Sequence, residues 1–575
     1  MPLVVDIETD SLQANKIWVV VTRDTKTNEI RSFREPVGFT NYIRDYDTFI
    51  GHNLLSFDVP VLNRLWGTHI KLSQIVDTLI LSQLFNPNRK GGHSLDNLAQ
   101  LAGCKKINFS DFSEYSEDML KYCINDVKIT HKVYKYLLAY ESHGFSKRSI
   151  SLEHKIRQVI NKQQYYGFLL DTKKAIQLLC EIKNKNEKIE KEIRGFFKPK
   201  VRPIKDIVVK RKKDGSISKV GLNHIENLRY LGGNHTTIRY EEFNLGSPKQ
   251  IVERMEEYGW EPIKFTPKGS PKVCEENLET LPPTAPDAVK KLALWKALET
   301  RWKNIDSWID ASTDDGRVHG KVFTMGAVTG RMTHSEPNMA NIVSSYKQYG
   351  KESRECFIAP KDYVLVDTDA SGLELRMLAH YMNNDEFTNE VVNGDPHTAN
   401  MKAAGLSTRS EAKTFIYAFL YGAGAEKIGS IVGGNPNIGA QLKKTFLSNM
   451  PELKLLQSKI ISEAKKKGYL NGIDGRRIHI RSPHAGLNTL LQGAGAIVCK
   501  QWAIEIDRRV RQEKLDAHLV CSIHDQYVYE VHEKSVDRFK EVCHTGIEQA
   551  GQYLEVRCPL SCDIGIGKTW YEAEH

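Results

Sequence analysis

Hydrophobic and polar positions follow two different periods in the first 200 residues. Residues 4–10 (VVDIETD) and the start of 49–62 (FIGHNLLSFDVPVL) are short apolar runs that predict strands. Residues 120–134 have apolar positions at helical spacing, and so does 151–197, where charged residues alternate with Ile and Leu, most clearly in 174–193. This order of strands and helices predicts an α/β domain at the N-terminus, followed by a long helical region.

The second half of the chain changes pattern again. Residues 288–309 have apolar positions at a spacing of 3.6, and 361–382 (KDYVLVDTDASGLELRMLAHYM) reads as a strand running into a helix. Residues 407–424 predict a helix, and 522–531 (SIHDQYVYEV) predict a β-hairpin with His524 and Asp525 at its turn.

The composition excludes some classes of protein but does not identify this one. A chain of 575 residues is too long for one core, so two or three packed units are expected. We find no run of about 18 apolar residues and no basic leader at the N-terminus, which argues against a membrane span and a signal peptide. Ten scattered cysteines without a zinc-ligand spacing favour reduced thiols, and hence a cytoplasmic location.

Positive charge is concentrated in one segment. The net charge is +10, and residues 197–240 alone hold 11 Lys and Arg against three Asp and Glu. Within this segment, 198–221 is basic, broken by proline and ends in turn residues, which predicts an extended loop or hairpin. The preceding helix, 174–193, is interpreted either as a helix that grips duplex DNA or as a surface helix without a ligand.

Acidic residues in the N-terminal domain form a recognisable series. Strand alternation places Asp6 and Glu8 on one face, and a helix places Tyr122 and Asp126 one turn apart. Together with Asp58 they make the patterns DxE, NxxxFD and YxxxD in that order. This series resembles the DEDDy branch of the 3′→5′ exonucleases. The resemblance implies an RNase H-like fold in which the four acids hold two divalent cations and Tyr122 orients the attacking water.

The C-terminal half resembles DNA polymerase family A. The blocks DASGLELR, RSEAKTFIYAFLYG and HD match motifs A, B and C of that family, and GAVTGR, EKIG and RSPHA follow its phage members as well. The resemblance covers the chain from Asp6 to His575. It implies a right-hand polymerase with palm, fingers and thumb around an antiparallel palm sheet.

The family's catalytic roles carry over onto matching positions. Asp369 of motif A and Asp525 of motif C would bind two metal ions, with the carbonyl of Ala370 completing the shell. Oxygen ligands suit Mg²⁺, or Mn²⁺, rather than zinc. Lys413 would act on the triphosphate as a catalytic residue.

Nucleotide and DNA contacts also carry over by resemblance. Glu374 would exclude a 2′-OH and thereby ribonucleotides. The residues expected to hold the incoming nucleotide with it are His397, Arg409, Lys413, Tyr417 and Tyr421. The residues expected at the minor groove of the new base pair are Arg331, Asn488, Gln492 and His524. Minor-groove acceptors are shared by the correct pairs, so donors there can test geometry without reading sequence.

One position departs from the family pattern. Family A members usually carry Glu directly after the motif C aspartate, whereas this chain has Gln526. Asp367, two residues before Asp369, also lies outside the motif. We expect tuned rather than lost synthesis, with the second metal site the part in doubt.

These inferences predict an α/β multidomain protein with a defined order of domains. The expected boundaries are an exonuclease at 1–150, a thumb at 151–310 with the basic insertion at about 197–240, a palm at 311–394 and 471–575, and fingers at 395–470. The expected activity is replicative DNA synthesis with proofreading, in phage DNA replication, by a monomer.

Three other functions fit parts of this pattern less well. A single-subunit RNA polymerase shares the palm but lacks the exonuclease and the Glu374 gate. A bacterial repair polymerase often carries a separate 5′-nuclease domain, and a DNA-binding scaffold would not need six carboxylates.

Expected partners are primer–template DNA and dNTPs. Candidate protein partners are a helicase–primase, a single-stranded-DNA-binding protein and a processivity factor. Thioredoxin is less favoured, since the basic segment is shorter than the insertion by which phage members recruit it.

Overall fold

The chain divides into two compact units in a computed structural model that describes residues 1–216, 218, 233–480 and 482–574. The first unit comprises residues 1–171 and 311–575, and the second comprises 172–310. Residues 151–171, expected to begin the thumb, therefore belong to the first unit. Within the described residues no helix is both long and apolar enough to cross a bilayer. The ten cysteines all lie among the described residues, and none of them is in a disulfide.

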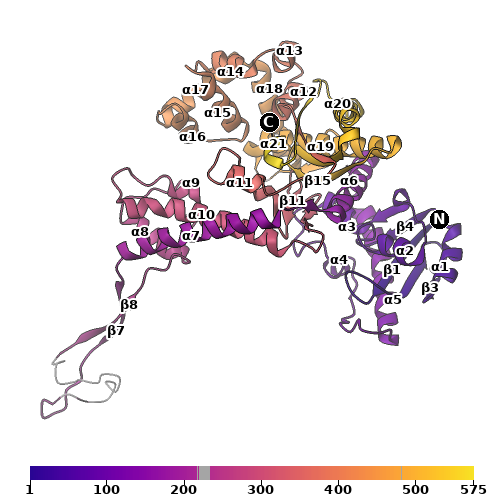
Figure 1. Cartoon of the computed structure of the whole chain (residues 1–575), viewed down its shortest axis with the longest axis horizontal. Helices are drawn as coiled ribbons and strands as arrows, with labels where there is room; N and C mark the ends of the chain where they lie inside the picture. Colours follow the sequence, from indigo (N-terminus) through magenta and orange to yellow (C-terminus); the bar gives the residue numbers. More distant parts are fainter. Residues whose placement is uncertain (217, 219–232, 481, 575) are drawn as a thin grey trace. The chain divides into compact units, whose positions relative to one another are not determined.

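The N-terminal part of the first unit is a five-stranded sheet of order β3-β2-β1-β4-β5. Strand β1 (Pro2–Thr9) pairs antiparallel with β2 (Ile17–Asp24) and parallel with β4 (Thr48–Gly51). Helices lie close to both faces (Figure 1). The remaining elements are β3 (Ile30–Phe33), β5 (Ile75–Asp77), α1 (Pro36–Tyr42), α2 (Asp58–Trp66), α3 (Thr78–Phe85), α4 (Leu95–Leu101) and α5 (Glu117–Tyr136).

Alternation along β1 decides which residues reach the site. Leu3, Val5 and Ile7 pack in one hydrophobic cluster, whereas Val4 packs in another with Cys123 of α5. Even-numbered residues therefore face α5, and Asp6 and Glu8 continue that face beyond Val4. The apolar half of β1 anchors the strand, so its acidic half is held rigidly against α5.

The palm sheet has the order β15-β16-β12-β17, and its neighbouring strands are antiparallel. This confirms the predicted antiparallel sheet. Its strands are β12 (Tyr363–Ala370), β15 (Ala517–Ile523), β16 (Gln526–His532) and β17 (Cys562–Gly567). Helix α19 (Gly486–Glu513), α20 (Val536–Tyr553) and α12 (Leu373–Met382) share a large hydrophobic core with it.

A group of helices is inserted between α12 and α19. They are α13 (Asp385–Asn393), α14 (Pro396–Ala404), α15 (Arg409–Leu420), α16 (Ala425–Ile431), α17 (Pro436–Asn449) and α18 (Pro451–Lys467) (Figure 1). A short hairpin of β13 (Tyr469–Asn471) and β14 (Arg477–His479) follows them. Phe415 and Phe419 of α15 pack on Phe446 of α17, which leaves the opposite face of α15 for the site.

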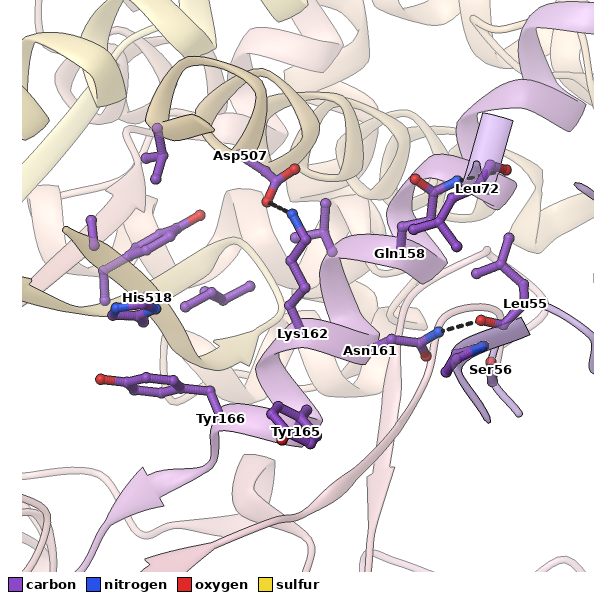
Figure 2. A pocket seen from close by; sticks show the side chains of 16 residues that line it. Leu55, Ser56, Leu72, Gln158, Asn161, Lys162, Tyr165, Tyr166, Asp507 and His518 are labelled. Carbon is purple, nitrogen blue, oxygen red and sulfur yellow. Dashed lines mark hydrogen bonds and ion pairs between the residues drawn. The ribbon is translucent and has the colours of Figure 1, made fainter. Parts of the chain in front are cut away.

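Helix α6 (Lys147–Tyr166) joins the exonuclease sheet to the palm. Its Arg157 donates to Ser56 on one side and to the Val322 carbonyl on the other. Figure 2 shows the cavity beside it, about 490 Å³ in volume, where Asn161 donates to Leu55 and Lys162 pairs with Asp507. These contacts place both candidate sites in one compact unit.

The second unit contains two long antiparallel-packed helices, α7 (Thr172–Phe196) and α10 (Asp287–Asp310), with α8 (Pro248–Glu256) and α9 (Glu275–Leu278). In the basic segment, β7 (Lys200–Ile207) pairs antiparallel with β8 (His235–Glu241), so the strand within 198–221 has its partner beyond the range for which a loop or hairpin was expected. Residues 217 and 219–232 of that segment lie outside the described residues. Lys200 and Arg202 of β7 are paired with Glu253 of α8.

The remaining described elements are short. The strand pairs are β6 (Phe168–Leu169) with β9 (Arg317–Val318) and β10 (Lys321–Phe323) with β11 (Thr333–Ser335). Helix α11 (Gly350–Arg354) precedes β12, and α21 (Trp570–Ala573) follows β17. The last of these helices places the buried indole of Trp570 beneath the palm sheet.

Candidate active sites

Motifs A and C meet at one end of the palm sheet. Asp369 lies at the end of β12, and Asp525 lies in the two-residue turn between β15 and β16, where His524 has a φ of 55°. The Ala370 amide donates to the Asp525 carbonyl over 3.1 Å, which ties the turn to the strand end. Asp369, Ala370 and Asp525 line one cavity of about 310 Å³. The structure therefore brings together the three residues expected to hold metal.

Electrostatics at this edge favour a cation. Burial raises the pKa of Asp369 to about 7, and the neighbouring Asp525, Asp367 and Asp563 add to the shift. Carboxylates that raise one another's pKa are stabilised when a positive charge lies between them. Two carboxylates and a backbone carbonyl opening onto one cavity fit Mg²⁺ or Mn²⁺, which take oxygen ligands.

The carboxylate of Glu374, the residue expected to exclude a 2′-OH, is held from two sides. Glu374, in the first turn of α12, accepts a hydrogen bond of 2.6 Å from the Tyr421 hydroxyl. Arg331 also donates to the same oxygen, over 3.4 Å. All three residues line the cavity, as do Tyr417 and His524. Sequence reasoning placed Arg331 at the DNA and Glu374 at the sugar but missed this contact between them.

The motif B stripe runs along the exposed face of α15. Ala412, Phe415 and Ile416 are buried on the opposite face, so Arg409 and Lys413 point to solvent and Tyr417 is half-buried. Of the stripe, only Tyr417 and Tyr421 line the cavity. The capping box of Thr408 and Glu411 fixes where the helix begins.

A second missed contact concerns Arg409. Its guanidinium makes a bidentate pair with Asp395, the N-cap of α14, at 2.7 and 3.1 Å. This pair lowers the pKa of Asp395. His397 follows on the same helix, with its ring 6.1 Å from that of Tyr417, and burial together with Arg409 and Lys413 lowers its pKa. The expected triphosphate residues thus lie near one another, outside the cavity.

The other expected DNA contacts lie on α19. Asn488 and Gln492 are four residues apart in that helix, so they share a face, and both are half-buried. They do not line the metal-site cavity, whereas Arg331 and His524 do. Burial and the nearby Arg331 lower the pKa of His524, which keeps its ring neutral.

The exonuclease acids gather between β1, α2 and α5. The ligand atoms of Asp6, Glu8 and Cys123 lie within 4.8 Å of one another. The Asp58 carboxylate accepts a hydrogen bond from the Ile7 amide at 3.2 Å, which attaches α2 to the same strand. Asp126 of α5 is linked to the group electrostatically, since it raises the pKa of both Asp6 and Glu8.

Crowding of these acids again favours divalent cations. Burial and neighbouring carboxylates raise the pKa of Asp6 to about 7 and that of Glu8 to about 9. The pKa values of Asp58 and Asp126 are raised as well, chiefly by burial. Three buried acids and the half-buried Asp6 fit the Mg²⁺ or Mn²⁺ ions expected for a DEDDy site. Burial raises the pKa of Tyr122 to about 12, so its hydroxyl stays protonated.

Lys106 was missed by sequence reasoning. It lies in the irregular segment before α5, and its ammonium pairs with Asp126 at 2.6 Å and lies 5.0 Å from the Tyr122 ring centroid. Phe109, from the same segment, packs on Tyr122 with ring centroids 5.5 Å apart. A lysine in a polar loop carries no sequence signal of such a role, because only the return of the loop over α5 brings it to the acids.

Asp77 was missed for a similar reason. It is fully buried at the end of β5, and its carboxylate accepts from the amides of Asn53 and Leu55 at 2.9 and 3.0 Å. Asn53 has a φ of 62°, a left-handed conformation that these bonds support. Asp77 thus shapes the turn that leads into Asp58.

Comparison with known proteins finds a family match in each half of the chain. Residues 3–139 match the family model described as 3′-5′ exonuclease, and residues 219–572 match DNA polymerase family A. The DNA-directed DNA polymerase of Enterobacteria phage T3 is 31% identical over 99% of this chain and 100% of that protein. That of Escherichia phage T7 is 30% identical over 99% of each chain.

A solved structure shares the fold over the whole chain. The POL domain of Pol1 from M. smegmatis, in complex with DNA primer-template and dNTP, superposes with a TM-score of 0.78 at 18% identity. That match covers 100% of this chain and 96% of the other. The fold and its two acidic sites define a DNA-directed DNA polymerase with a 3′→5′ exonuclease domain. The chain belongs to DNA polymerase family A and is related to the polymerases of phages T3 and T7.

Proposed function

We propose that this protein is a replicative polymerase that proofreads its own product, working on primer–template DNA and dNTPs in phage DNA replication. The observation that supports this most is the presence of two separate acidic sites in one chain, one around Asp369 and Asp525 and one around Asp6 and Glu8. The similarity to phage polymerases over nearly the full chain supports the replicative role.

In synthesis, the two divalent ions would lower the pKa of the primer 3′-OH and neutralise the leaving pyrophosphate. The side chains would position the reactants. Asp369, Asp525 and the Ala370 carbonyl would hold the ions, and Lys413, Arg409 and His397 would hold the triphosphate. Such alignment accounts for several kcal/mol of the barrier, on the order of 7 or more in well-oriented systems.

Arg409 would have to exchange partners when a nucleotide binds. Its pair with Asp395 is exposed to solvent, which screens the attraction, so a triphosphate can replace the carboxylate at little cost. We infer that Asp395 holds the Arg409 guanidinium close to the position in which it would bind the triphosphate. Glu374 and Tyr417 would then contact the sugar, and Arg331, Asn488, Gln492 and His524 the minor groove.

In editing, Asp6, Glu8, Asp58 and Asp126 would hold the ions at the scissile phosphate. The protonated hydroxyl of Tyr122 would orient the attacking water. We assign residues 1–150 to this domain, 395–470 to the fingers, and 311–394 with 471–575 to the palm. Of the expected thumb, 151–310, we assign residues 172–310, because 151–171 belong to the first compact unit.

The test is separation of the two activities. Asp369→Ala or Asp525→Ala should abolish primer extension while excision of a single-stranded 3′ end continues. Asp6→Ala combined with Glu8→Ala should do the reverse. Each variant is the folding control for the other, and loss of both activities in a folded variant would refute the two-site assignment.

We propose that the basic residues 210–213, which follow β7, contact an additional part of the DNA duplex. Lys210, Lys212 and Lys213 are exposed, whereas Lys200 and Arg202 of β7 are paired with α8. Neutralising these three with Arg211 should lower the salt slope of primer–template binding by up to about 0.9 for each phosphate that is no longer neutralised. An unchanged slope would favour a small protein partner instead. We expect added thioredoxin to leave processivity unchanged.

A further inference from the structure

Gln526 directly follows Asp525 but does not line the cavity that Asp525 and Asp369 share. Its side-chain amide donates to Asp367 Oδ2 over 2.6 Å. The indole of Trp570 donates to the same oxygen over 3.1 Å. Asp367 and Trp570 are both fully buried, so this carboxylate depends on protein donors rather than water.

The strand register explains how the side chain reaches Asp367. Asp369 on β12 lies directly opposite Gln526 on β16. Directly opposed residues share a face of the sheet, and Asp367 shares it too because it is two residues from Asp369. The amide of Gln526 therefore spans from one strand to the other on the face that carries the metal-site acid.

The position of this bridge is significant. β12 ends here, just after Asp369, and β16 begins here, directly after the turn that contains Asp525. Their backbones are joined at the same point by the hydrogen bond from Ala370 to Asp525. A side-chain link between the strands at this point limits how far the two acids can move apart.

We propose that Gln526 and Asp367 act as a positioning pair for the polymerase site, holding Asp369 and Asp525 at the spacing that synthesis needs. The residue at 526 is the donor of this pair, because Asp367 Oδ2 accepts from both Gln526 and Trp570. A glutamate there would place two carboxylates at hydrogen-bond distance and remove one of the two donors that Asp367 Oδ2 has in the structure. This inference rests on the proposed roles of Asp369 and Asp525.

Exchanging the carboxylate and the amide between positions 367 and 526 tests the pair. Gln526→Glu should lower kcat for synthesis at least about tenfold, the scale expected when a buried charged hydrogen bond is removed. Asp367→Asn should cost less, since an amide can accept from Gln526 and Trp570. The double variant D367N/Q526E should recover to within about threefold of the wild type, because the new amide can donate to the new carboxylate.

Three further readouts separate positioning from general loss of structure. Excision of single-stranded DNA should stay within about twofold in all three variants, since that site is elsewhere in the chain. The KM for dNTP should change less than kcat, because the nucleotide residues lie on α14 and α15. In EDTA, the Tm should fall in Q526E and return in the double variant.

Several outcomes would overturn the inference. They are wild-type synthesis in Q526E, or a double variant no better than Q526E alone. If Q526E lost excision as well, it would be misfolded, and Gln526→Met would decide instead. That variant has similar length and no donor, and undiminished synthesis in it would also overturn the inference. Retained synthesis in Asp369→Ala would instead refute the proposed function on which it rests.

Discussion

The hydroxyl of Tyr421 donates a 2.6 Å hydrogen bond to Glu374, linking the end of motif B to the residue expected to exclude ribonucleotides. The bond crosses from the inserted helices to α12 of the palm side. Burial and this hydrogen bond raise the pKa of Tyr421, so the phenol remains a donor. The orientation of the gate therefore depends on a tyrosine that does not itself need to touch the sugar.

Removing that hydroxyl should weaken sugar selection. A hydrogen bond to a charged group contributes about 1.5–3 kcal/mol. Tyr421→Phe should therefore reduce discrimination against ribonucleotides by roughly tenfold or more. Glu374→Ala should reduce it further. Steady-state incorporation of rNTP against dNTP in the exonuclease-deficient background measures the effect, and an unchanged ratio in Tyr421→Phe would show that Glu374 is held by Arg331 alone.

Tyr417 should govern the response to chain terminators. The side chain lines the metal-site cavity and is half-buried, with a pKa raised by burial and by Glu374. A dideoxynucleotide lacks the 3′-OH that can hydrogen-bond to its own phosphate, and the tyrosine hydroxyl can replace that bond. The wild type should therefore accept ddNTP nearly as well as dNTP, while Tyr417→Phe should favour dNTP by up to about 10³, or about 4 kcal/mol.

The measurement is competition between ddNTP and dNTP without editing, since excision would remove the terminator. Tyr421→Phe is the matched control, because it should alter ribose selection and leave ddNTP use unchanged. If Tyr417→Phe changes the ddNTP ratio by less than about threefold, Tyr417 serves only helix packing.

Lys106 should be needed for editing and not for synthesis. Its ammonium pairs with Asp126 and lies beside the ring of Tyr122, so it supplies positive charge to the acid that completes the exonuclease site. Lys106→Met should slow excision at least about tenfold, because a partly buried carboxylate loses a charged hydrogen bond. Lys106→Arg should retain part of the rate. Lys105→Met, at the exposed neighbouring position, is the control and should excise normally.

The metal-free exonuclease site should destabilise the protein as pH rises. The pKa of Glu8 is raised to about 9 in the folded chain, above its ordinary value of 4.5, chiefly by burial and then by Asp6. The folded state therefore binds more protons than the unfolded chain between these values. Stability is greatest below about pH 4.5 for this group and is lost as pH rises toward 9.

Glu8→Gln should remove that loss. In EDTA at pH 8 the variant should have a higher Tm than the wild type, whereas at pH 5 the two should nearly agree. Mg²⁺ should raise the wild-type Tm more than that of the variant, because it replaces the missing protons. Thermal unfolding across pH decides the point, and equal Tm values at pH 8 would contradict the shared burial of these acids.

The sequence by itself determined the local elements and the chemistry they carry. Alternation in VVDIETD placed Asp6 and Glu8 on one face, and the structure has them there because Val4 packs against α5. The spacing of Arg409, Lys413, Tyr417 and Tyr421 predicted a single stripe, and the buried residues of α15 lie opposite it. The spacing of apolar residues and the order of the motifs are properties of the sequence itself, so they can be recognised before the fold is known.

Tertiary structure decided which of these residues have partners. Lys106 reaches Asp126, Arg409 reaches Asp395, and Gln526 reaches Asp367 across a span of 159 positions. None of these pairs can be recognised from a periodic pattern in the sequence. Each depends on how a loop folds back onto the domain or on how two distant strands align. Pairing of β12 with β16 sets the register that places Gln526 opposite Asp369 and within reach of Asp367, and that register follows from packing of the whole palm core.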